Sequence, residues 1–255
     1  MKLLAAIFAA LALLLSGPGV VALTDGRVSD DWRTASRASA GLAPDAAATP
    51  EAVVQVYAAR AFKWRGAFAV HSWIAVKPAG AAAYTVYEVT GWAVRRGGRA
   101  VQDHEAVPDR HWYGARPNVL AELRGPQAAV AIGRIEAAVA AYPYPDSYTT
   151  WPGPNSNTFV AHVLRQVPEL RADLPPTAIG KDYLPGPAFA AVTPSGTGGQ
   201  FSLFGLAGIA VGIEEGIEIN ILGLGFGIDP GELALRLPGI GTVGLNTRAA
   251  AAPSP

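Results

Sequence analysis

The stretch Gly153-Pro154-Asn155-Ser156-Asn157-Thr158-Phe159-Val160 places a small hydroxyl residue at the predicted start of an amphipathic helix. Apolar residues recur after it at the spacing of one helix face, and Pro168 ends the pattern. Ser156 precedes Phe159 by three residues, so its side chain falls on the buried stripe of this helix. The stretch therefore predicts either a helix cap or a nucleophile held at a helix start.

The chemistry of a helix start favours a nucleophile at Ser156. Asn155 is a good N-cap, which makes Ser156 the first helical residue. A nucleophile there gains from the positive end of the helix dipole, and the first-turn amides of Asn157 and Thr158 are candidate donors of an oxyanion hole. Serine and asparagine at a helix start are nevertheless commonest as caps, so both interpretations stay open at this point.

A serine nucleophile needs a base, and His71 is the best candidate. It lies in a strand predicted at 67–76, which the turn Pro78-Ala79-Gly80 connects to a second strand predicted at 83–94. If that turn is centred on its Ala-Gly bond, His71 lies opposite Glu88 on one side of the sheet, where the carboxylate can orient the imidazole. A register slip of one residue would bring a tyrosine opposite instead.

The other histidines offer alternatives to His71. His104 and His111 stand in loop-like sequence, where spacing constrains nothing, and either could act as the base. His162 is six residues after Ser156 in the predicted helix and should face another direction. The histidines lack the close spacing of metal ligands, and the glycine-rich segments lack phosphate-binding spacing. We therefore expect neither a metal nor another cofactor.

A proline- and aromatic-rich loop at 142–153 leads into the Ser156 helix and is expected to line a cleft. The side chains that flank this loop, the helix start and the His71 strand are the candidate binding residues. They are Asn155, Asn157, Thr158, Trp151, Tyr148 and Trp73.

Further elements are predicted on both sides of this region. Thr49-Pro50-Glu51 supplies an N-cap, a first-turn proline and an acid, which predicts a helix to about Ala61. Apolar residues at helical spacing predict another helix at about 126–141. In the glycine-dense stretch 198–244, apolar residues alternate with period two at 217–221 and 222–228, which predicts strands.

The N-terminus has the pattern of an export signal. Met1-Lys2 precedes a continuous apolar run from Leu3 to Leu15, and small residues follow. The run from Leu3 to Leu23 also approaches the ~20 residues that span a bilayer, so an uncleaved anchor is the alternative. We expect an exported protein that is periplasmic or held at the inner membrane through its N-terminus.

Composition limits the partners and the architecture. The chain has 255 residues, with 20 Lys+Arg, 20 Asp+Glu and no cysteine. Zero net charge without a basic stripe argues against a nucleic-acid partner, and the missing cysteine excludes disulfides and a thiolate nucleophile. The length suits one domain with appendages. We expect a signal or anchor at 1–23, a linker at 24–48, an α+β domain at 49–190, a glycine-rich β extension at 191–248 and a disordered tail at 249–255.

The motifs Val70-His71-Ser72-Trp73-Ile74 and Asn155 to Val160 resemble those of circularly permuted papain-like proteins, which include NlpC-type peptidases and relatives of lecithin–retinol acyltransferase. In that group a histidine on an early strand precedes a cysteine that begins a helix. The resemblance implies a core in which an antiparallel sheet packs on helices, with Ser156 at the cysteine position and His71 at the histidine position. Serine is a poorer nucleophile than thiolate in such a site.

A longer resemblance, covering nearly the full chain, is to an uncharacterised bacterial family, domain of unknown function 3750. It implies a bacterial envelope protein and carries no established activity. The matching motifs are Asp31-Trp32-Arg33, Tyr57, Trp64-Arg65-Gly66, His71-Ser72-Trp73-Ile74, Trp151 to Phe159, Gly180-Lys181-Asp182-Tyr183 and Leu237-Pro238-Gly239-Ile240-Gly241.

Three functional hypotheses follow. The first is a serine-dependent amidase, peptidase or acyl hydrolase or transferase, with Ser156 as nucleophile, His71 as base and Glu88 as orienting group, acting on a cell-wall peptide or a lipid or acyl substrate. The second is a non-catalytic envelope module that keeps the same cleft for binding. The third is a structural, membrane-associated protein that assembles through its glycine-rich strands.

Overall fold

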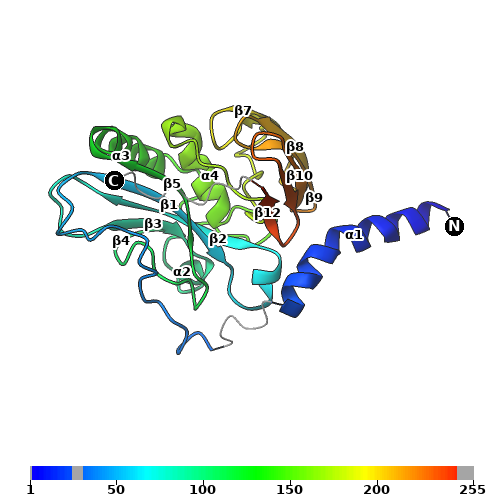
Figure 1. Cartoon of the computed structure of the whole chain (residues 1–255), viewed down its shortest axis with the longest axis horizontal. Helices are drawn as coiled ribbons and strands as arrows, with labels where there is room; N and C mark the ends of the chain where they lie inside the picture. The colour runs from blue at the N-terminus through cyan, green and yellow to red at the C-terminus, as the bar shows by residue number, and fades with distance from the viewer. Residues whose placement is uncertain (1, 25–30, 246–255) are drawn as a thin grey trace.

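The structure, a computed structural model, describes residues 2–24 and 31–245. Within these residues the chain is a mixed α/β protein with two antiparallel sheets and a few helices (Figure 1). An N-terminal helix, α1 (Lys2–Thr24), projects from the body. The tail expected at 249–255 lies outside the described residues.

The first sheet has five strands in the order β4-β3-β2-β1-β5, and it carries the candidate site. Two helices pack over one of its faces, α3 (Gly125–Ala140) and α4 (Ser156–Gln166), and they enclose the larger apolar core with it (Figure 1). The helices predicted at 126–141 and after Asn155 are thereby confirmed. The strands are β1 (Val53–Arg60), β2 (Val70–Lys77), β3 (Thr85–Val89), β4 (Val101–Glu105) and β5 (Asn118–Arg124).

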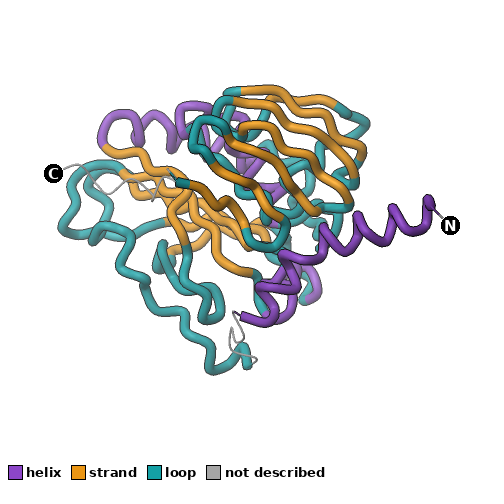
Figure 2. The backbone as a smooth tube through the Cα atoms, turned by 45° about the vertical axis from the view of Figure 1, so that its right-hand side comes forward, coloured by secondary structure: helices purple, strands orange, loops and turns teal. Residues whose placement is uncertain are grey.

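The opposite face of this sheet is covered by chain without regular structure, not by helices (Figure 2). Leu42, Ala43 and Ala46 pack there against a second apolar cluster around Tyr57 and Trp73. The buried carboxylate of Asp109 ties this covering down, because it accepts hydrogen bonds from the Ser39 hydroxyl and the Leu42 amide. Residues 39–46 of the expected linker are therefore held against the sheet.

The helix predicted at 49–61 is wrong, because this stretch forms the sheet strand β1. β1 lies between β2 and β5 and is buried on both faces, so its sequence is mostly apolar and does not alternate. The apparent cap at 49–51 serves another purpose: the buried ammonium of Lys77 donates to the carbonyls of Thr49 and Glu51, at 2.7 Å each.

The strand predicted at 67–76 is confirmed as β2, whereas the one predicted at 83–94 is too long. β3 ends at Val89, and a short helix, α2 (Gly91–Arg95), follows it. Gly91 packs against the ring of Tyr148, where an added Cβ would lie 2.5 Å from the ring. The chain therefore turns away from the sheet at this glycine and brings α2 to the edge of the candidate site.

The second sheet is a seven-stranded meander in which each strand pairs with the next along the chain. The strands predicted at 217–221 and 222–228 correspond to its members β9 and β10, which confirms their period-two pattern. Its strands are β6 (Ala190–Val192), β7 (Gly198–Leu203), β8 (Ala207–Gly212), β9 (Gly216–Ile221), β10 (Leu224–Asp229), β11 (Ala234–Leu237) and β12 (Gly241–Gly244).

The second sheet attaches to the first unit through a buried ionic network. Glu218 on β9 accepts from Lys181 at 2.8 Å and from Arg236 at 2.6 Å, and Arg236 also donates to Asp173. Asn220, two residues further along β9, donates to Asp182 at 3.1 Å. The motif Gly180-Lys181-Asp182-Tyr183 therefore supplies the charges that meet the inward face of this sheet.

Helix α1 meets the body at the motif Leu237-Pro238-Gly239-Ile240-Gly241. Gly17 lies against the carbonyl of Pro238, and Pro18 lies against Gly239. The short helix η1 (Lys63–Ala67) contacts α1 as well, whereas η2 (Pro168–Leu170) follows α4. None of the helices in the described part of the chain is both long and apolar enough to cross a membrane.

Candidate functional site

Asn155, and not Ser156, caps helix α4. The Asn155 side-chain oxygen accepts from the amides of Asn157 (3.0 Å) and Thr158 (3.2 Å), and the Thr158 hydroxyl accepts from the Asn155 amide in return. This capping box engages both amides that were expected to form an oxyanion hole. The first-turn amide left over is that of Ser156, for which the described residues provide no acceptor.

The cap residues are held in place by hydrogen bonds to the backbone of residues 179–180. The Asn155 side-chain amide donates to the carbonyls of Thr150 and Ile179, and the Thr158 hydroxyl donates to the carbonyl of Gly180. Gly180 has φ +99°, and an added Cβ would lie 2.4 Å from the Asn155 amide nitrogen. Only glycine fits here, so the start of α4 is fixed before any substrate binds.

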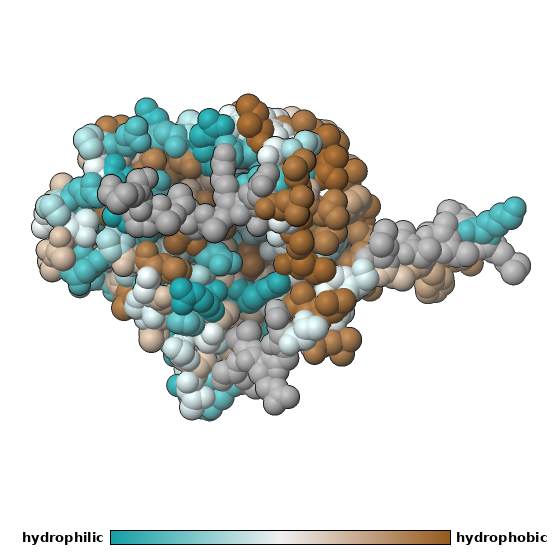
Figure 3. All heavy atoms as spheres, viewed as in Figure 1, coloured by the Kyte–Doolittle hydropathy of each residue, from teal (hydrophilic) through white to brown (hydrophobic). Residues whose placement is uncertain are grey.

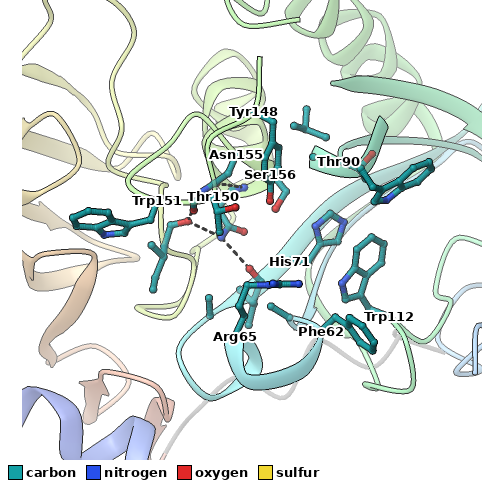
Figure 4. A pocket seen from close by; sticks show the side chains of 18 of the residues that line it. Phe62, Arg65, His71, Thr90, Trp112, Tyr148, Thr150, Trp151, Asn155 and Ser156 are labelled. Carbon is teal, nitrogen blue, oxygen red and sulfur yellow. Dashed lines mark hydrogen bonds between the residues drawn. The ribbon is translucent and has the colours of Figure 1, made fainter. Parts of the chain in front are cut away.

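Asn157 locks the start of α4 onto the start of β2. Its side-chain oxygen accepts from the Ser72 hydroxyl at 2.8 Å, and its nitrogen donates to the carbonyls of Val70 and Ile179. The candidate binding residue Asn157 is therefore engaged in joining helix and strand. This junction brings Ser156 and His71 to the wall of one cavity (Figure 4).

His71 and Glu88 are hydrogen-bonded, with 3.0 Å between Nε2 and a carboxylate oxygen. The hairpin register differs from the expected one, because Ile74 pairs with Tyr87 and Val76 with Thr85. The turn is centred one residue later, which shifts the pairing by two residues and keeps every side chain on its expected face. His71 therefore reaches Glu88 diagonally across the pair of strands.

Basic side chains surround the buried carboxylate of Glu88. Arg110 donates to it at 2.7 Å, and His104 lies 3.6 Å from the same oxygen. Burial alone would raise the pKa of Glu88, but the hydrogen bond from His71 and the charge of Arg110 outweigh it, so the pKa is lowered. The carboxylate is therefore ionised at neutral pH.

His71 is held in the neutral form that a general base requires. Burial lowers the pKa of His71 below its ordinary value of 6.5, and the Glu88 hydrogen bond only partly opposes this. Because the ionised Glu88 carries no proton, the Nε2 atom of His71 is the donor of their hydrogen bond. The lone pair of the neutral ring then lies on Nδ1.

Aromatic rings fix the plane of the His71 imidazole. The Trp112 ring stacks on it with 3.6 Å between centroids, and Trp73 stacks at 5.7 Å. Trp73 is fully buried and donates its indole N–H to the carbonyl of Pro108, so this candidate binding residue supports His71 from outside the cavity lining. Sequence reasoning missed Trp112 and Arg110. The only available signal was the gathering of arginine, histidine and tryptophan in one loop.

The cavity at this junction has a volume of about 810 Å³, and Figure 4 shows Ser156 and His71 on its wall. Tyr148 and Trp151 line it as expected from the aromatic loop, and Trp151 also donates to the carbonyl of Leu222 at 2.9 Å. No acidic side chain of the described residues lines this cavity. The basic side chains that do are Arg37, Arg65, Arg95 and Arg96.

The remaining histidines lie away from this cavity. His111 faces the carbonyl of Ala38 at 2.9 Å, and His162 faces the carbonyl of Ala138 at 3.1 Å. His104 and His111 line a smaller neighbouring cavity of about 160 Å³, together with Glu88. Within the described ranges no three His, Asp or Glu side chains gather in a way that could hold a metal ion.

The fold and the site define a mixed α/β protein in which a serine at a helix N-terminus and a histidine line one cavity, with the histidine hydrogen-bonded to a buried carboxylate. The chain belongs to the family described as protein of unknown function DUF3750, whose model matches residues 51–183. The matched range begins just before β1 and ends at Tyr183, so it includes Ser156, His71 and Glu88. No curated protein and no solved structure matches the chain.

Proposed function

We propose that this protein is a serine-dependent acyl-group hydrolase or transferase of the bacterial envelope, built on a permuted papain-like core. One observation carries the proposal. Asn155 takes over the capping of α4, so the Ser156 hydroxyl is left facing a cavity that it shares with His71, whose other nitrogen is bonded to ionised Glu88. A nucleophile, a base and an orienting group are then present in order.

The reaction follows from these positions. The Ser156 oxygen attacks the substrate carbonyl carbon while its proton passes to His71 Nδ1, and Glu88 stabilises the resulting imidazolium. The Ser156 amide and the positive end of α4 stabilise the oxyanion. His71 then gives the proton to the departing amine or alcohol, which leaves an acyl-serine. Water or another acceptor attacks this ester through the same base and releases the acyl group.

The free structure has no hydrogen bond between the Ser156 hydroxyl and His71. Bonds of this kind are often long in a free enzyme and tighten once substrate is bound. The neutral state of His71 agrees with this reading, since a base must keep its lone pair until the nucleophile is deprotonated. Substrate binding is proposed to bring the two groups within reach.

The lining of the cavity favours an anionic acyl compound. Its cationic side chains are all arginines, which bind carboxylate and phosphate groups with two parallel hydrogen bonds. Aromatic walls, including Phe62 and Trp112, add apolar contact area. A cell-wall peptide with free carboxylates and a lipid with a phosphate head group both have this chemistry. Export through the N-terminal segment would bring the protein to either.

Labelling with a fluorophosphonate tests the proposal directly. The serine oxygen attacks phosphorus and displaces fluoride, so only an activated serine is labelled. We expect labelling of the unaltered protein, loss of labelling in Ser156→Ala and His71→Gln, and full labelling in the control Ser147→Ala, which removes an exposed serine of the aromatic loop. Labelling that survives Ser156→Ala would contradict the assignment of the nucleophile.

A non-catalytic binding module is the second candidate, and the cap favours it. The amides of Asn157 and Thr158 are already engaged, so the oxyanion would have only the Ser156 amide and the helix dipole. In that case the unaltered protein takes no label, and Ser156→Ala binds an anionic acyl ligand as tightly as the unaltered protein does. The same two proteins therefore separate the two candidates.

A further inference from the structure

The second sheet presents a continuous apolar face to the outside. Directly paired residues form rows across the strands, such as Phe201, Ile209 and Ile219 on β7, β8 and β9. Each side chain of this apolar face is between 38% and 52% exposed, and Figure 3 shows a brown area beside α1. The apolar face consists of Phe201, Leu203, Ile209, Val211, Ile217, Ile219, Ile221, Ile228, Leu235 and Val243.

The alternation of this sheet is the reverse of that in a water-soluble one. Residues between those of the apolar face point inward, and they include the buried charges Glu218 and Arg236 and the buried Asn220. A sheet exposed to water on one side keeps its polar residues on that side. Here the polar side is turned to the protein and satisfied there, so the outward side is matched to an apolar medium.

The size and chemistry of the apolar face suit a bilayer better than a protein. At about 4.8 Å per strand, β7 to β12 extend over about 24 Å, and strands of six residues add about 20 Å in the other direction. Exposed apolar patches of several hundred Å² mark protein or membrane contacts. Protein interfaces also carry hydrogen bonds, and none of the side chains of this face can donate or accept one.

Helix α1 projects from the side of the molecule to which the apolar face is turned (Figures 1 and 2). Its exposed apolar side chains include Leu4, Phe8 and Leu15. A second copy of the chain that laid its sheet on the apolar face would have to accommodate the projecting α1 as well. Lipids, by contrast, can surround a helix and contact a sheet at the same time.

The base of α1 carries residues typical of a membrane–water boundary. The short helix η1 contacts α1 and presents Lys63 and a Trp64 that is 71% exposed. Tryptophan and lysine are favoured at the level of the lipid head groups, where an apolar ring or stem meets water. These residues lie where the edge of a docked bilayer would be.

We propose that the apolar face of the second sheet docks onto a lipid bilayer, with the exposed side of α1 in the acyl layer beside it. The partner is the membrane surface itself, and its hydrocarbon provides the medium that the outward side chains require. Leu222, in the turn after β9, and Leu224, the first residue of β10, also line the cavity that holds Ser156, so docking would place the rim of that cavity next to the lipid.

The absence of cysteine from the chain makes a clean test possible. An environment-sensitive fluorophore is attached in the full-length protein through Ile209→Cys or Ile228→Cys, both on the apolar face. The matched control is Val130→Cys, an exposed valine of α3. Helix α3 lies on the opposite side of the molecule from α1 (Figure 1). Phe8→Cys reports on α1 separately. Thermal unfolding shows that each labelled protein is folded.

Vesicles of phosphatidylcholine with phosphatidylglycerol are then added to each labelled protein. We expect a blue shift of the emission and loss of quenching by aqueous iodide at positions 209 and 228, and neither change at position 130. Changes at position 8 alone would overturn the proposal, because only the helix would then be in lipid. A blue shift at 209 that needs no vesicles and grows with protein concentration would also overturn it, in favour of a second copy.

Discussion

The two sheets of this protein differ in which of their side chains they bury. The first sheet buries apolar residues on both faces, under helices on one side and irregular chain on the other. The second buries charged and amide side chains against the protein and leaves isoleucines, leucines and valines outside. A period of two shows that the faces of a strand differ, but which face is buried depends on what covers it. The following changes test that contrast.

Breaking the ionic network should have the largest effect on stability. Arg236→Met removes a fully buried guanidinium and leaves Glu218 and Asp173 with fewer partners. We expect a loss of about 3–5 kcal/mol in the free energy of unfolding, measured with urea. The matched control Arg134→Met breaks an exposed ion pair with Glu169 and should cost about 1 kcal/mol or less. Equal losses would mean that the inward charges do not hold the second sheet.

A matched pair of isoleucines compares the sheets directly. Ile74→Ala in β2 removes a fully buried side chain and should cost about 2–5 kcal/mol. Ile219→Ala in β9 removes one that is 38% exposed and should cost clearly less in urea without lipid. If the two variants lose the same stability, the apolar face is covered in solution, and its description as an outward face is wrong.

Acid should destabilise the folded protein through His71. His71 has a pKa below its ordinary 6.5 in the folded chain, so the unfolded chain binds its proton first as the pH falls. The stability that neutral His71 provides is therefore complete above pH 6.5 and is lost as the pH falls from there through the lowered pKa. Nuclear magnetic resonance of the imidazole should give a midpoint below 6.5. A midpoint above that value would contradict the assignment of a neutral base.

The site was predictable where its signals are local. The cap residue Asn155 followed by a helical apolar stripe identified the start of α4, and a short hairpin brought His71 and Glu88 to one face even though the register was shifted. A shift of two residues preserves the face of every side chain, whereas a shift of one would have separated the pair. The contact between His71 and Glu88 was therefore predicted correctly although the register of the two strands was not.

Interactions between distant parts of the chain could not be predicted. β1 was taken for a helix because a strand buried on both faces loses its alternation. Arg110 and Trp112 reach Glu88 and His71 from a loop whose path depends on Asp109 holding the N-terminal segment. The engagement of the Asn157 and Thr158 amides, by contrast, follows from the N-cap role of Asn155 and was predictable, because an N-cap side chain accepts from the second and third helical amides.

The central claim is that the start of α4, with His71, forms an environment that activates a nucleophile. Ser156→Cys tests this without a substrate, because the chain contains no other thiol. The rate of iodoacetamide alkylation as a function of pH gives the pKa of the introduced thiol. We predict a pKa below about 7.5, lowered by the helix dipole and the imidazole, against about 8.5 for the exposed control Ser147→Cys. The same pKa at both positions would contradict the account.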